Sequence, residues 1–316
     1  MVMRLVFMGT PHFAIPSLKK LLGSSHPIVV VFTQPDRPSG RGERISAPPV
    51  KVLAEQHGIP VHQPEKLKEE IWKKTFQQIH ADALVVVAFG KILPRWLLEI
   101  PPLGAFNLHA SLLPKYRGAA PVQWAIANGE SETGVTTMKL DQGMDTGDIL
   151  LQERVRIAPQ ETAVDLQERL AGVGADLLLQ TINLLESGGL HPMNQNPAFA
   201  TYAPSLKKED GLIRWEQWTA QEIYNRIRAF NPWPGTYTLI NGQVLRIWSA
   251  IPLEVSIDAQ SPGTLVSASP EDPIIVCARG CLRLIEVQLE NRKRMPAPDM
   301  FHGLRIAKNQ PVSLGR

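Results

Sequence analysis

The chain has 316 residues, of which 44% are hydrophobic and 20% are charged, as in an ordinary globular protein with room for two domains. The formal net charge is only +3, which argues against a partner held by a strong overall field, such as bulk DNA. The first apolar run ends at Gly9, and no later segment approaches the roughly 20 apolar residues of a membrane span. We therefore expect a cytoplasmic protein that uses neither DNA nor a membrane.

Strand and helix patterns alternate through the first part of the chain. We predict strands at 5–8, 28–33, 83–88 and 105–108, and helices at 13–22, 49–57, 66–78, 119–128 and 163–185. The strand segments are continuously apolar, which indicates that both faces of their sheet are covered. This alternation predicts an α/β fold with a doubly wound, Rossmann-like parallel sheet.

The second part of the chain has a different pattern. Residues 190–206 are polar, contain proline and lack periodicity, so we interpret them as a linker between a domain at 1–189 and a domain at 207–316. After a helix at 219–229, we predict short strands at 236–240, 243–250, 263–266, 274–278 and 281–288. Five short strands with Asn-Gly and Arg-Gly turns suggest a small β-barrel of the OB type.

Residues 190–316 carry 14 basic and 11 acidic side chains, so the whole positive excess lies in the second part of the chain. Any polyanionic partner would therefore be held by local patches. The only cysteines are Cys277 and Cys281, which we interpret as buried thiols because no companion ligands accompany them. The turn at Gly9 lacks both common phosphate-binding glycine patterns, and it could serve either as a tight turn or as an anion site.

The segments around Asn107, His109 and Asp145 contain the most informative polar residues. Asn107 and His109 lie two apart at the end of a predicted strand, so their side chains leave the same face of it. An amide donor, an imidazole and a carboxylate would suit attack of an external amine on a carbonyl carbon. No serine or cysteine is placed as an evident nucleophile. A histidine at a strand end can also be structural, and residues 145–148 could be a simple Asx-turn loop.

The same segments carry a resemblance to a known family. Asn107-Leu108-His109, Ser111–Pro114 and Asp145-Thr146-Gly147 resemble the signature of the folate-dependent formyltransferases. Further segments are most similar to the members that act on methionyl-tRNA; they are residues 7–11, 31–42, 116–121, 132–136 and 228–234. The resemblance spans both predicted domains and is weakest in the last third of the second domain.

This resemblance implies transfer of a formyl group from 10-formyltetrahydrofolate to the α-amine of methionyl-initiator-tRNA, through a tetrahedral intermediate and without a covalent enzyme intermediate. Asn107 and His109 would polarise the formyl carbonyl, and Asp145 would tune His109 and accept proton density. The residues implied to line the folate site are Ser111, Leu112, Leu113, Pro114, Phe89, Gly90, Lys91, Ile92, Asp141, Gly143 and Met144. An α-amine has a free pKa of about 7.7, so its neutral fraction is appreciable and we expect no metal dependence.

Two groups of basic residues are candidates for tRNA binding. The resemblance implies that the loop with Arg37, Arg41 and Arg44 inserts at the acceptor stem, where arginine can bind phosphates or base edges. The second group would hold phosphates non-specifically; it comprises Lys207, Lys208, Arg292, Lys293, Arg294, Arg305, Lys308 and Arg316. From composition alone, both groups could instead be solvated surface.

Three other functions remain open from the sequence. A hydrolase could use the same residues to release formate, and a related transferase could use a nucleotide sugar or glycinamide ribotide as acceptor. The chain could also be a tRNA-binding module with an inactive enzyme domain. No long heptad or exposed apolar helix demands a partner, so we expect a monomer.

Overall fold

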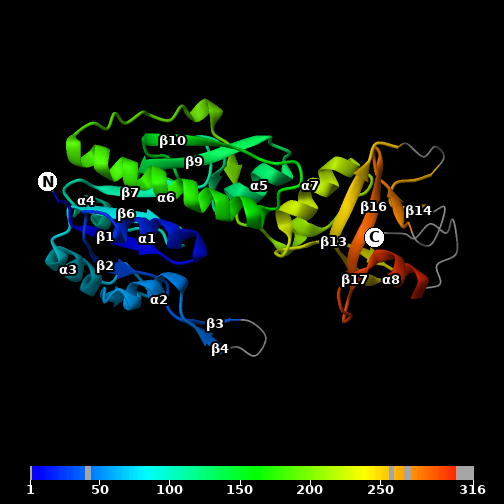
Figure 1. The fold of residues 1–316 in the computed structure, drawn as a ribbon, viewed down its shortest axis with the longest axis horizontal. Coiled ribbons are helices and arrows are strands. Elements are labelled where there is room, and N and C mark those ends of the chain that lie inside the picture. The colour runs from blue at the N-terminus through cyan, green and yellow to red at the C-terminus, as the bar shows by residue number, and fades with distance from the viewer. Residues whose placement is uncertain (1, 40–43, 256–259, 267–271, 304–316) are drawn as a thin grey trace. The chain divides into compact units, whose positions relative to one another are not determined.

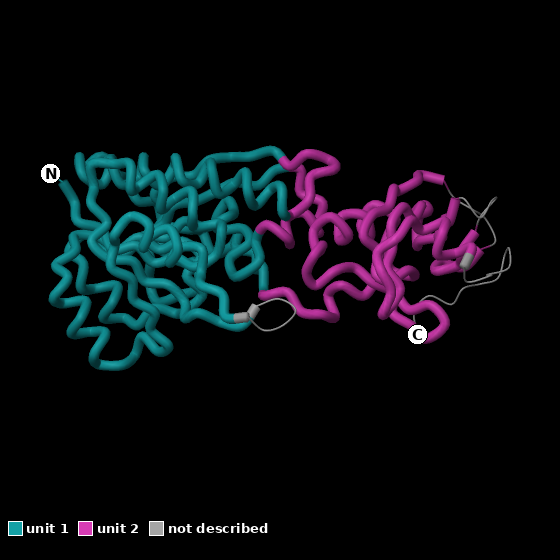
Figure 2. The backbone as a smooth tube through the Cα atoms, turned by 60° about the horizontal axis from the view of Figure 1, so that its bottom comes forward, with its two compact units in different colours: residues 1–121, 132–156, 164–204 teal, residues 122–131, 157–163, 205–316 magenta. Residues whose placement is uncertain are grey.

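The computed structural model describes residues 2–39, 44–255, 260–266 and 272–303. The chain forms two compact units, which are distinguished by colour in Figure 2. Unit 1 comprises residues 1–121, 132–156 and 164–204, and unit 2 comprises residues 122–131, 157–163 and 205–316. Two short segments from the first half of the chain therefore pack with the second half.

A seven-stranded mixed sheet forms the centre of unit 1 (Figure 1). Its strands are β1 (Leu5–Gly9), β2 (Ile28–Phe32), β5 (Val61–His62), β6 (Ala83–Val87), β7 (Ala105–His109), β9 (Glu132–Lys139) and β10 (Ile149–Arg156). They are ordered β10-β9-β7-β6-β1-β2-β5; β5, β2, β1, β6 and β7 pair in parallel, and β9 pairs antiparallel with both β7 and β10. The strand order reverses between β1 and β6, which is where open α/β sheets form a crevice at the carboxyl ends of their strands.

Helices cover both faces of this sheet (Figure 1). They are α1 (Ile15–Leu22), α2 (Pro49–Gln56), α3 (Glu70–Ile79), α4 (Arg95–Glu99) and α6 (Ala163–Ser187), with a 3-10 turn η1 (His12–Ala14) before α1. On one face, Phe76 of α3 and Leu97 of α4 pack against Met8 in the core. On the other face, α1 and α6 are joined by the ion pair between Lys20 and Asp176, at 2.5 Å. The continuously apolar strands thus bury both faces, as the sequence predicts.

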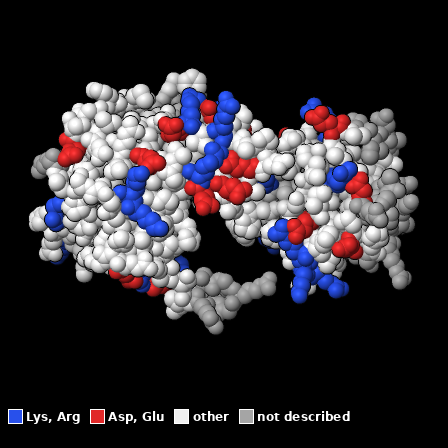
Figure 3. Space-filling model, viewed as in Figure 1, with Lys and Arg blue, Asp and Glu red and all other residues white. Residues whose placement is uncertain are grey.

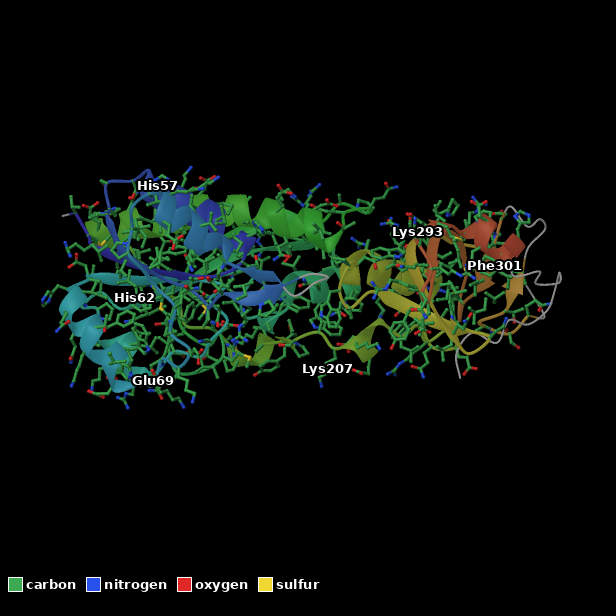
Figure 4. The ribbon with its side chains drawn as sticks, turned by 90° about the horizontal axis from the view of Figure 1, so that it is seen from below. His57, His62, Glu69, Lys207, Lys293 and Phe301 are labelled. Atoms are coloured by element: carbon green, nitrogen blue, oxygen red, sulfur yellow. The ribbon has the colours of Figure 1, made fainter. Side chains whose placement is uncertain are left out.

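The α3 side of the sheet has an aromatic cluster around Phe32. Its ring stacks on Phe76 with centroids 4.4 Å apart and meets the ring of Trp72 edge-on. His62, labelled in Figure 4, packs against the same Phe32 ring at 5.1 Å. Burial lowers the pKa of His62, so the imidazole is neutral in the folded protein at neutral pH. Burial of the Phe32 and Phe76 rings contributes about 1.5–3 kcal/mol each to folding.

Smaller elements complete unit 1. They are the hairpin β3 (Arg37–Ser39) and β4 (Arg44–Ser46), the pair β8 (Arg117–Gly118) and β11 (Tyr202–Ala203), and the 3-10 turn η2 (Pro197–Phe199). β8 and β11 pair in parallel, which attaches the segment after α6 to the loop after β7.

A six-stranded antiparallel sheet forms the centre of unit 2. Its strands are β12 (Thr236–Ile240), β13 (Gln243–Leu253), β14 (Leu265–Val266), β15 (Ile274–Val276), β16 (Cys281–Leu289) and β17 (Met295–Pro296). The helical elements are α5 (Pro121–Ala127), whose first residue belongs to unit 1, α7 (Ala220–Phe230), α8 (Ala297–Gly303) and the 3-10 turn η3 (Lys208–Gly211). Ile223 and Ile227 of α7 are buried in the same core as Ile247 of β13.

The predicted fold class is confirmed, with a doubly wound α/β sheet followed by a curled antiparallel sheet of OB type. Asn241 and Gly242 form the predicted turn between β12 and β13, and both have positive φ. Strands β5, β9 and β10 were not predicted from the sequence. Because β9 pairs antiparallel with β7 and β10, the sheet is mixed rather than wholly parallel. The interpretation of Cys277 and Cys281 as buried thiols is also confirmed.

The buried thiols give a testable expectation. Burial raises the pKa of Cys277 to about 12, and burial also raises the pKa of Cys281. Only about 10⁻⁴ of the Cys277 thiol is therefore ionised at pH 8, and the thiolate is the reactive form. We expect Ellman's reagent to leave both cysteines of the native protein unmodified at pH 8 and to label both in guanidinium. Fast labelling of native protein would contradict this arrangement.

Candidate active site

The strand β7 carries Asn107 and His109 to the carboxyl end of the parallel part of the sheet. In the register, Asn107 lies beside Val86 of β6, and His109 lies beside Thr136 of β9. Asn107 is half-buried, and its amide has no hydrogen-bond partner among the residues that the structure describes. His109 is only 6% exposed. The strand thus presents an available amide next to a fixed imidazole.

The hydrogen bond of His109 determines which ring nitrogen carries a proton. Its Nε2 lies 2.9 Å from the carbonyl oxygen of Tyr116, and a carbonyl can only accept. Nε2 therefore carries a hydrogen in both the neutral and the charged ring. Nδ1 lies 3.7 Å from Oδ2 of Asp145, which is too long for a hydrogen bond but close for an ion pair. Nδ1 is therefore the nitrogen that can gain or lose a proton beside the carboxylate.

Asp145 lies on the loop between β9 and β10 in an unusual backbone conformation. Its φ is +53°, and a residue other than glycine in this region costs about 1–3 kcal/mol. Its Oδ2 accepts a hydrogen bond of 2.8 Å from the backbone N–H of Gly118. That bond ties the carboxylate to the same loop whose Tyr116 carbonyl holds His109. The structure therefore brings His109 and Asp145 together, as the sequence predicts.

The loop that leads to Asp145 is exposed and closes on itself. Asp141 accepts hydrogen bonds from Gly143 N at 3.0 Å and from Thr146 Oγ1 at 2.7 Å. This is the Asx-type turn that the sequence left open, but it lies four residues earlier than Asp145. At the end of the loop, a Cβ on Gly147 would overlap the carbonyl of Lys139. The loop can therefore approach β9 only because residue 147 is glycine.

Residues 111–114 divide between the core and the surface. Ser111 is fully buried and donates to the carbonyl of Lys115 at 2.6 Å, and Leu113 packs with Met138 and Ile149. Leu112 and Pro114 are half-buried. Ser111 and Leu113 therefore hold the turn at residues 111–115 in place. Leu112 and Pro114 are the more accessible members of the predicted folate site.

The segment 89–92 follows β6 at the switch in strand order. Phe89 is 2% exposed, and its carbonyl accepts from Thr10 Oγ1 and from Gln34 Nε2, both at 3.0 Å. Gly90 is exposed with φ +81°, and Ile92 is 91% exposed. Ile92 is therefore an accessible apolar side chain at this edge of the sheet.

Lys91 and Gly9 lie near the same edge of the sheet. Lys91 Nζ donates to the carbonyls of Pro64 and Glu65, and burial followed by the charge of Arg37 lowers the pKa of Lys91. A Cβ on Gly9 would come within 2.9 Å of the Ala14 Cβ and 3.0 Å of the Val87 carbonyl. This close packing supports the interpretation of Gly9 as a tight turn.

The arginine loop begins at a fixed base. Asp36 accepts from Lys51 Nζ and from Gln63 Nε2, both at 2.7 Å, and these hydrogen bonds lower the pKa of Asp36. From this base extends the hairpin β3–β4, on which the side chain of Arg37 is exposed. Arg44 lies on β4, and Arg41 lies outside the described residues.

The described members of the second basic group lie in two places of unit 2, and Arg305, Lys308 and Arg316 lie outside the described residues. Lys207 and Lys208 are exposed at η3, and Lys207 appears well away from Lys293 in Figure 4. Lysine and arginine gather at the β16–β17 end of unit 2 in Figure 3, where Arg292, Lys293 and Arg294 are exposed. Arg294 pairs with Glu286 and lies 4.6 Å from the centre of the Trp248 ring.

Sequence reasoning missed two polar residues beside Asp145. Gln195 donates to the backbone carbonyls of Asp145 and Gly147, and Arg117 donates twice to Gln195. Arg117 lay within a motif quoted for the resemblance, and Gln195 lay in the segment interpreted as a linker. The only signal in the sequence was that Gln195 is a polar amide among prolines. Such a pattern does not show which distant part of the chain the residue contacts.

The described residues contain neither a metal-binding cluster nor a membrane-spanning helix. No group of three or more His, Cys, Asp or Glu side chains is arranged to hold a metal ion there. Among the described helices, none combines the length and the apolar character needed to cross a membrane.

Comparison with known proteins identifies the family. Residues 3–182 match the family model described as "Formyl transferase", and residues 205–305 match "Formyl transferase, C-terminal domain". The chain belongs to the formyl transferase family. The predicted resemblance is thus confirmed over both parts of the chain.

Relatives and a solved structure agree with this assignment. A "Methionyl-tRNA formyltransferase" of Geobacter metallireducens is 47% identical over 96% of both chains, and one of Desulforamulus reducens is 48% identical over 96% of both chains. The fold is similar to that of an N-formyltransferase from Helicobacter canadensis, solved with folinic acid and dTDP-3-aminofucose. That comparison has a TM-score of 0.66 at 22% identity and covers 93% of this chain and 100% of the other.

The geometry predicts that His109 and Asp145 carry formyl transfer in this member of the family. We expect His109→Ala and Asp145→Asn each to lower the single-turnover rate by about 10²–10⁴-fold, because each removes a group that manages the proton. His57→Ala is the matched control, since His57 is exposed at the end of α2 (Figure 4). Rates within about threefold of the unmodified protein, in folded His109→Ala, would refute this role.

Proposed function

We propose that this chain transfers the formyl group of 10-formyltetrahydrofolate to the α-amine of methionyl-initiator-tRNA. Family membership and relatives close to half identical over 96% of the chain support this acceptor. The observation that carries the chemistry is the pair of His109 and Asp145, 3.7 Å apart, at the strand end that also carries Asn107, whose amide has no partner among the described residues. Those groups form a site for polarising a carbonyl and moving a proton.

The residues divide the reaction between them. Asn107 donates an N–H to the formyl oxygen as the amine nitrogen forms its bond to the formyl carbon, and protonated His109 adds a positive charge beside the developing oxyanion. Asp145 stabilises that charge and accepts proton density from the amine. When the tetrahedral intermediate collapses, the bond between the formyl carbon and the folate nitrogen breaks, and the proton is returned to that nitrogen. No side chain becomes covalently attached.

The donor would bind at the edge of the sheet where accessible apolar and polar groups lie together. Ile92 and Met144 are 91% and 64% exposed, and Leu112 and Pro114 are half-buried. We infer that Ile92, Leu112 and Met144 cover the apolar ring system, with Phe89, Gly90, Asp141 and Gly143 shaping the backbone around it. Ser111 and Leu113 would hold the turn beneath it, and Pro114 would contact it beside Leu112.

For the acceptor, we propose a catalytic domain at 1–189 and a tRNA-binding domain at 207–316, joined by residues 190–206. Arg37, Arg41 and Arg44 would contact the acceptor stem. Lys207 and Lys208, together with residues 292–294, would contact phosphates farther along the tRNA. We further propose that the protein is a cytoplasmic monomer that acts in translation initiation and needs no metal for the chemical step.

One assay separates this function from its alternatives. The protein is incubated with 10-formyltetrahydrofolate and methionyl-initiator-tRNA, methionyl-elongator-tRNA or no tRNA, and formyl-methionine and tetrahydrofolate are both measured. We expect formylation of the initiator tRNA only. Tetrahydrofolate release without tRNA would indicate the hydrolase, and tRNA retention without transfer would indicate a binding module. Transfer only to a sugar nucleotide or glycinamide ribotide would indicate another acceptor.

The proposed role of the arginine loop gives a separate prediction. Arg41→Ala should lower kcat/KM for methionyl-initiator-tRNA by at least about fivefold, because a bidentate arginine contact contributes about 1–3 kcal/mol. The KM for 10-formyltetrahydrofolate should stay within about twofold. Arg154→Ala is the matched control, since Arg154 is an exposed arginine on β10. Equal effects of Arg41→Ala on both substrates would count against this role.

A further inference from the structure

We propose that Gln195, oriented by Arg117, is a positioning residue that holds Asp145 in place beside His109. This inference rests on the proposed function and deepens it, because it adds two residues that support the proton-transfer pair. Neither residue touches the reacting atoms in this arrangement. Gln195 acts through the backbone of the loop that carries Asp145, and Arg117 acts through Gln195.

The side-chain amide of Gln195 connects two carbonyls of the loop. Its Nε2 donates to the carbonyl of Asp145 at 2.8 Å and to the carbonyl of Gly147 at 2.7 Å. Both hydrogens of one NH2 group are therefore used, one on the carbonyl of Asp145 itself and one on the carbonyl two residues farther along the loop. A residue with positive φ persists only where its surroundings fix it, and these two bonds fix the turn at Asp145.

Arg117 determines which way this amide points. Its Nε and Nη2 donate to Oε1 of Gln195 at 3.1 and 2.8 Å. An arginine has only donors, so the atom of Gln195 that faces it must be the oxygen. The NH2 group must then face the two loop carbonyls. The orientation of the amide follows from hydrogen-bond chemistry, which settles the choice between its oxygen and nitrogen. Arg117 is 5% exposed, so this guanidinium is held within the fold.

Gln195 belongs to a segment that spans both loops of the site. We call residues 193–203 the strap. Met193 exchanges backbone hydrogen bonds with Ile149 at 2.8 Å, and Ala203 pairs with Gly118. Thr201 accepts from the backbone N–H of Tyr116, at 2.8 Å, through its Oγ1. The strap therefore contacts the loop that holds His109 as well as the loop that carries Asp145.

The strap gives an internal control for this inference. Asn194 is adjacent to Gln195 and donates to Oδ1 of Asp148 at 2.6 Å, on the same loop but not to the backbone around Asp145. Asn194→Ala loosens the strap without removing the bonds to Asp145 and Gly147. If substitution of Gln195 acted only by weakening the attachment of the strap, Asn194→Ala would lower the transfer rate too. If it acts through Asp145, Asn194→Ala would not lower the rate in the same way.

The decisive variant is Gln195→Glu, which keeps the size of the side chain and an acceptor for Arg117 but removes both donors to the loop. Formyl transfer to methionyl-initiator-tRNA is measured in single turnovers, together with the KM values and the melting temperature. We expect Gln195→Glu to lower the rate about 10–100-fold, as for a displaced catalytic group, with both KM values within about threefold. Asn194→Ala should stay within about threefold in rate.

A double-mutant cycle separates positioning from a merely structural role. If Gln195 acts through Asp145, then Gln195→Glu should change the rate less than about twofold in an Asp145→Ala background. An equal loss of rate in both backgrounds would overturn the inference. So would a folded Gln195→Glu variant with an unchanged rate.

The same experiment also deals with an unmodified protein that transfers no formyl group and with a Gln195→Glu variant that does not fold. The unmodified protein is assayed first, and a protein that transfers no formyl group would overturn the proposed function and this inference together. If Gln195→Glu does not fold, the cycle is repeated with Gln195→Met, which also lacks donors and has a similar length. The same losses are expected, and an additive cycle would again overturn the inference.

Discussion

The hydrogen bond between His109 Nε2 and the Tyr116 carbonyl determines how the rest of the site can work. Because that carbonyl can only accept, the proton on Nε2 is fixed, and all proton transfer by the ring must use Nδ1. Nδ1 faces Asp145, so the carboxylate and the imidazole act as one unit. The backbone at 116–118 therefore has two roles, since it anchors the ring through Tyr116 and the carboxylate through the N–H of Gly118.

This dependence on one loop explains why the segment after α6 folds back on unit 1. The loop at 116–118 has no neighbour of its own in the main sheet, and its pairing with residues 202–203 supplies the missing backbone contacts. The same returning segment binds the loop around Asp145 through Gln195. The two loops are thus tied to a common third segment as well as to each other through the bond from Gly118 to Asp145, and these contacts restrict their relative movement.

Strands and site residues that follow from local sequence pattern were predicted, whereas those that depend on contacts between distant parts of the chain were missed. The apolar runs at β1, β2, β6 and β7 identify four of the five parallel strands, and the spacing of Asn107 and His109 places both on one face. β9 and β10 were missed because their burial does not simply alternate, and polar Thr136 and Thr137 are fully buried in β9. Thr137 is accommodated by a hydrogen bond with Thr181 of α6, 44 residues away. Gln195 was missed for the same reason, since its partners at 117 and 145–147 are far away in sequence.

Charge on unit 2 is less available than its sequence suggests. Arg294 is paired with Glu286 and lies over the Trp248 ring, which Arg246 also approaches at 5.3 Å. A guanidinium that already has a carboxylate and an aromatic face must give up part of these contacts to bind a phosphate. Arg292 and Lys293 have no such ion pair among the described residues, so they are the free charges of this cluster.

For the proposed contact with tRNA, residues 292–294 would therefore neutralise about two phosphates rather than three, with a correspondingly smaller dependence of affinity on salt. Because arginine side chains already lie over the Trp248 ring, this ring would support residues 292–294 and would not stack on a base.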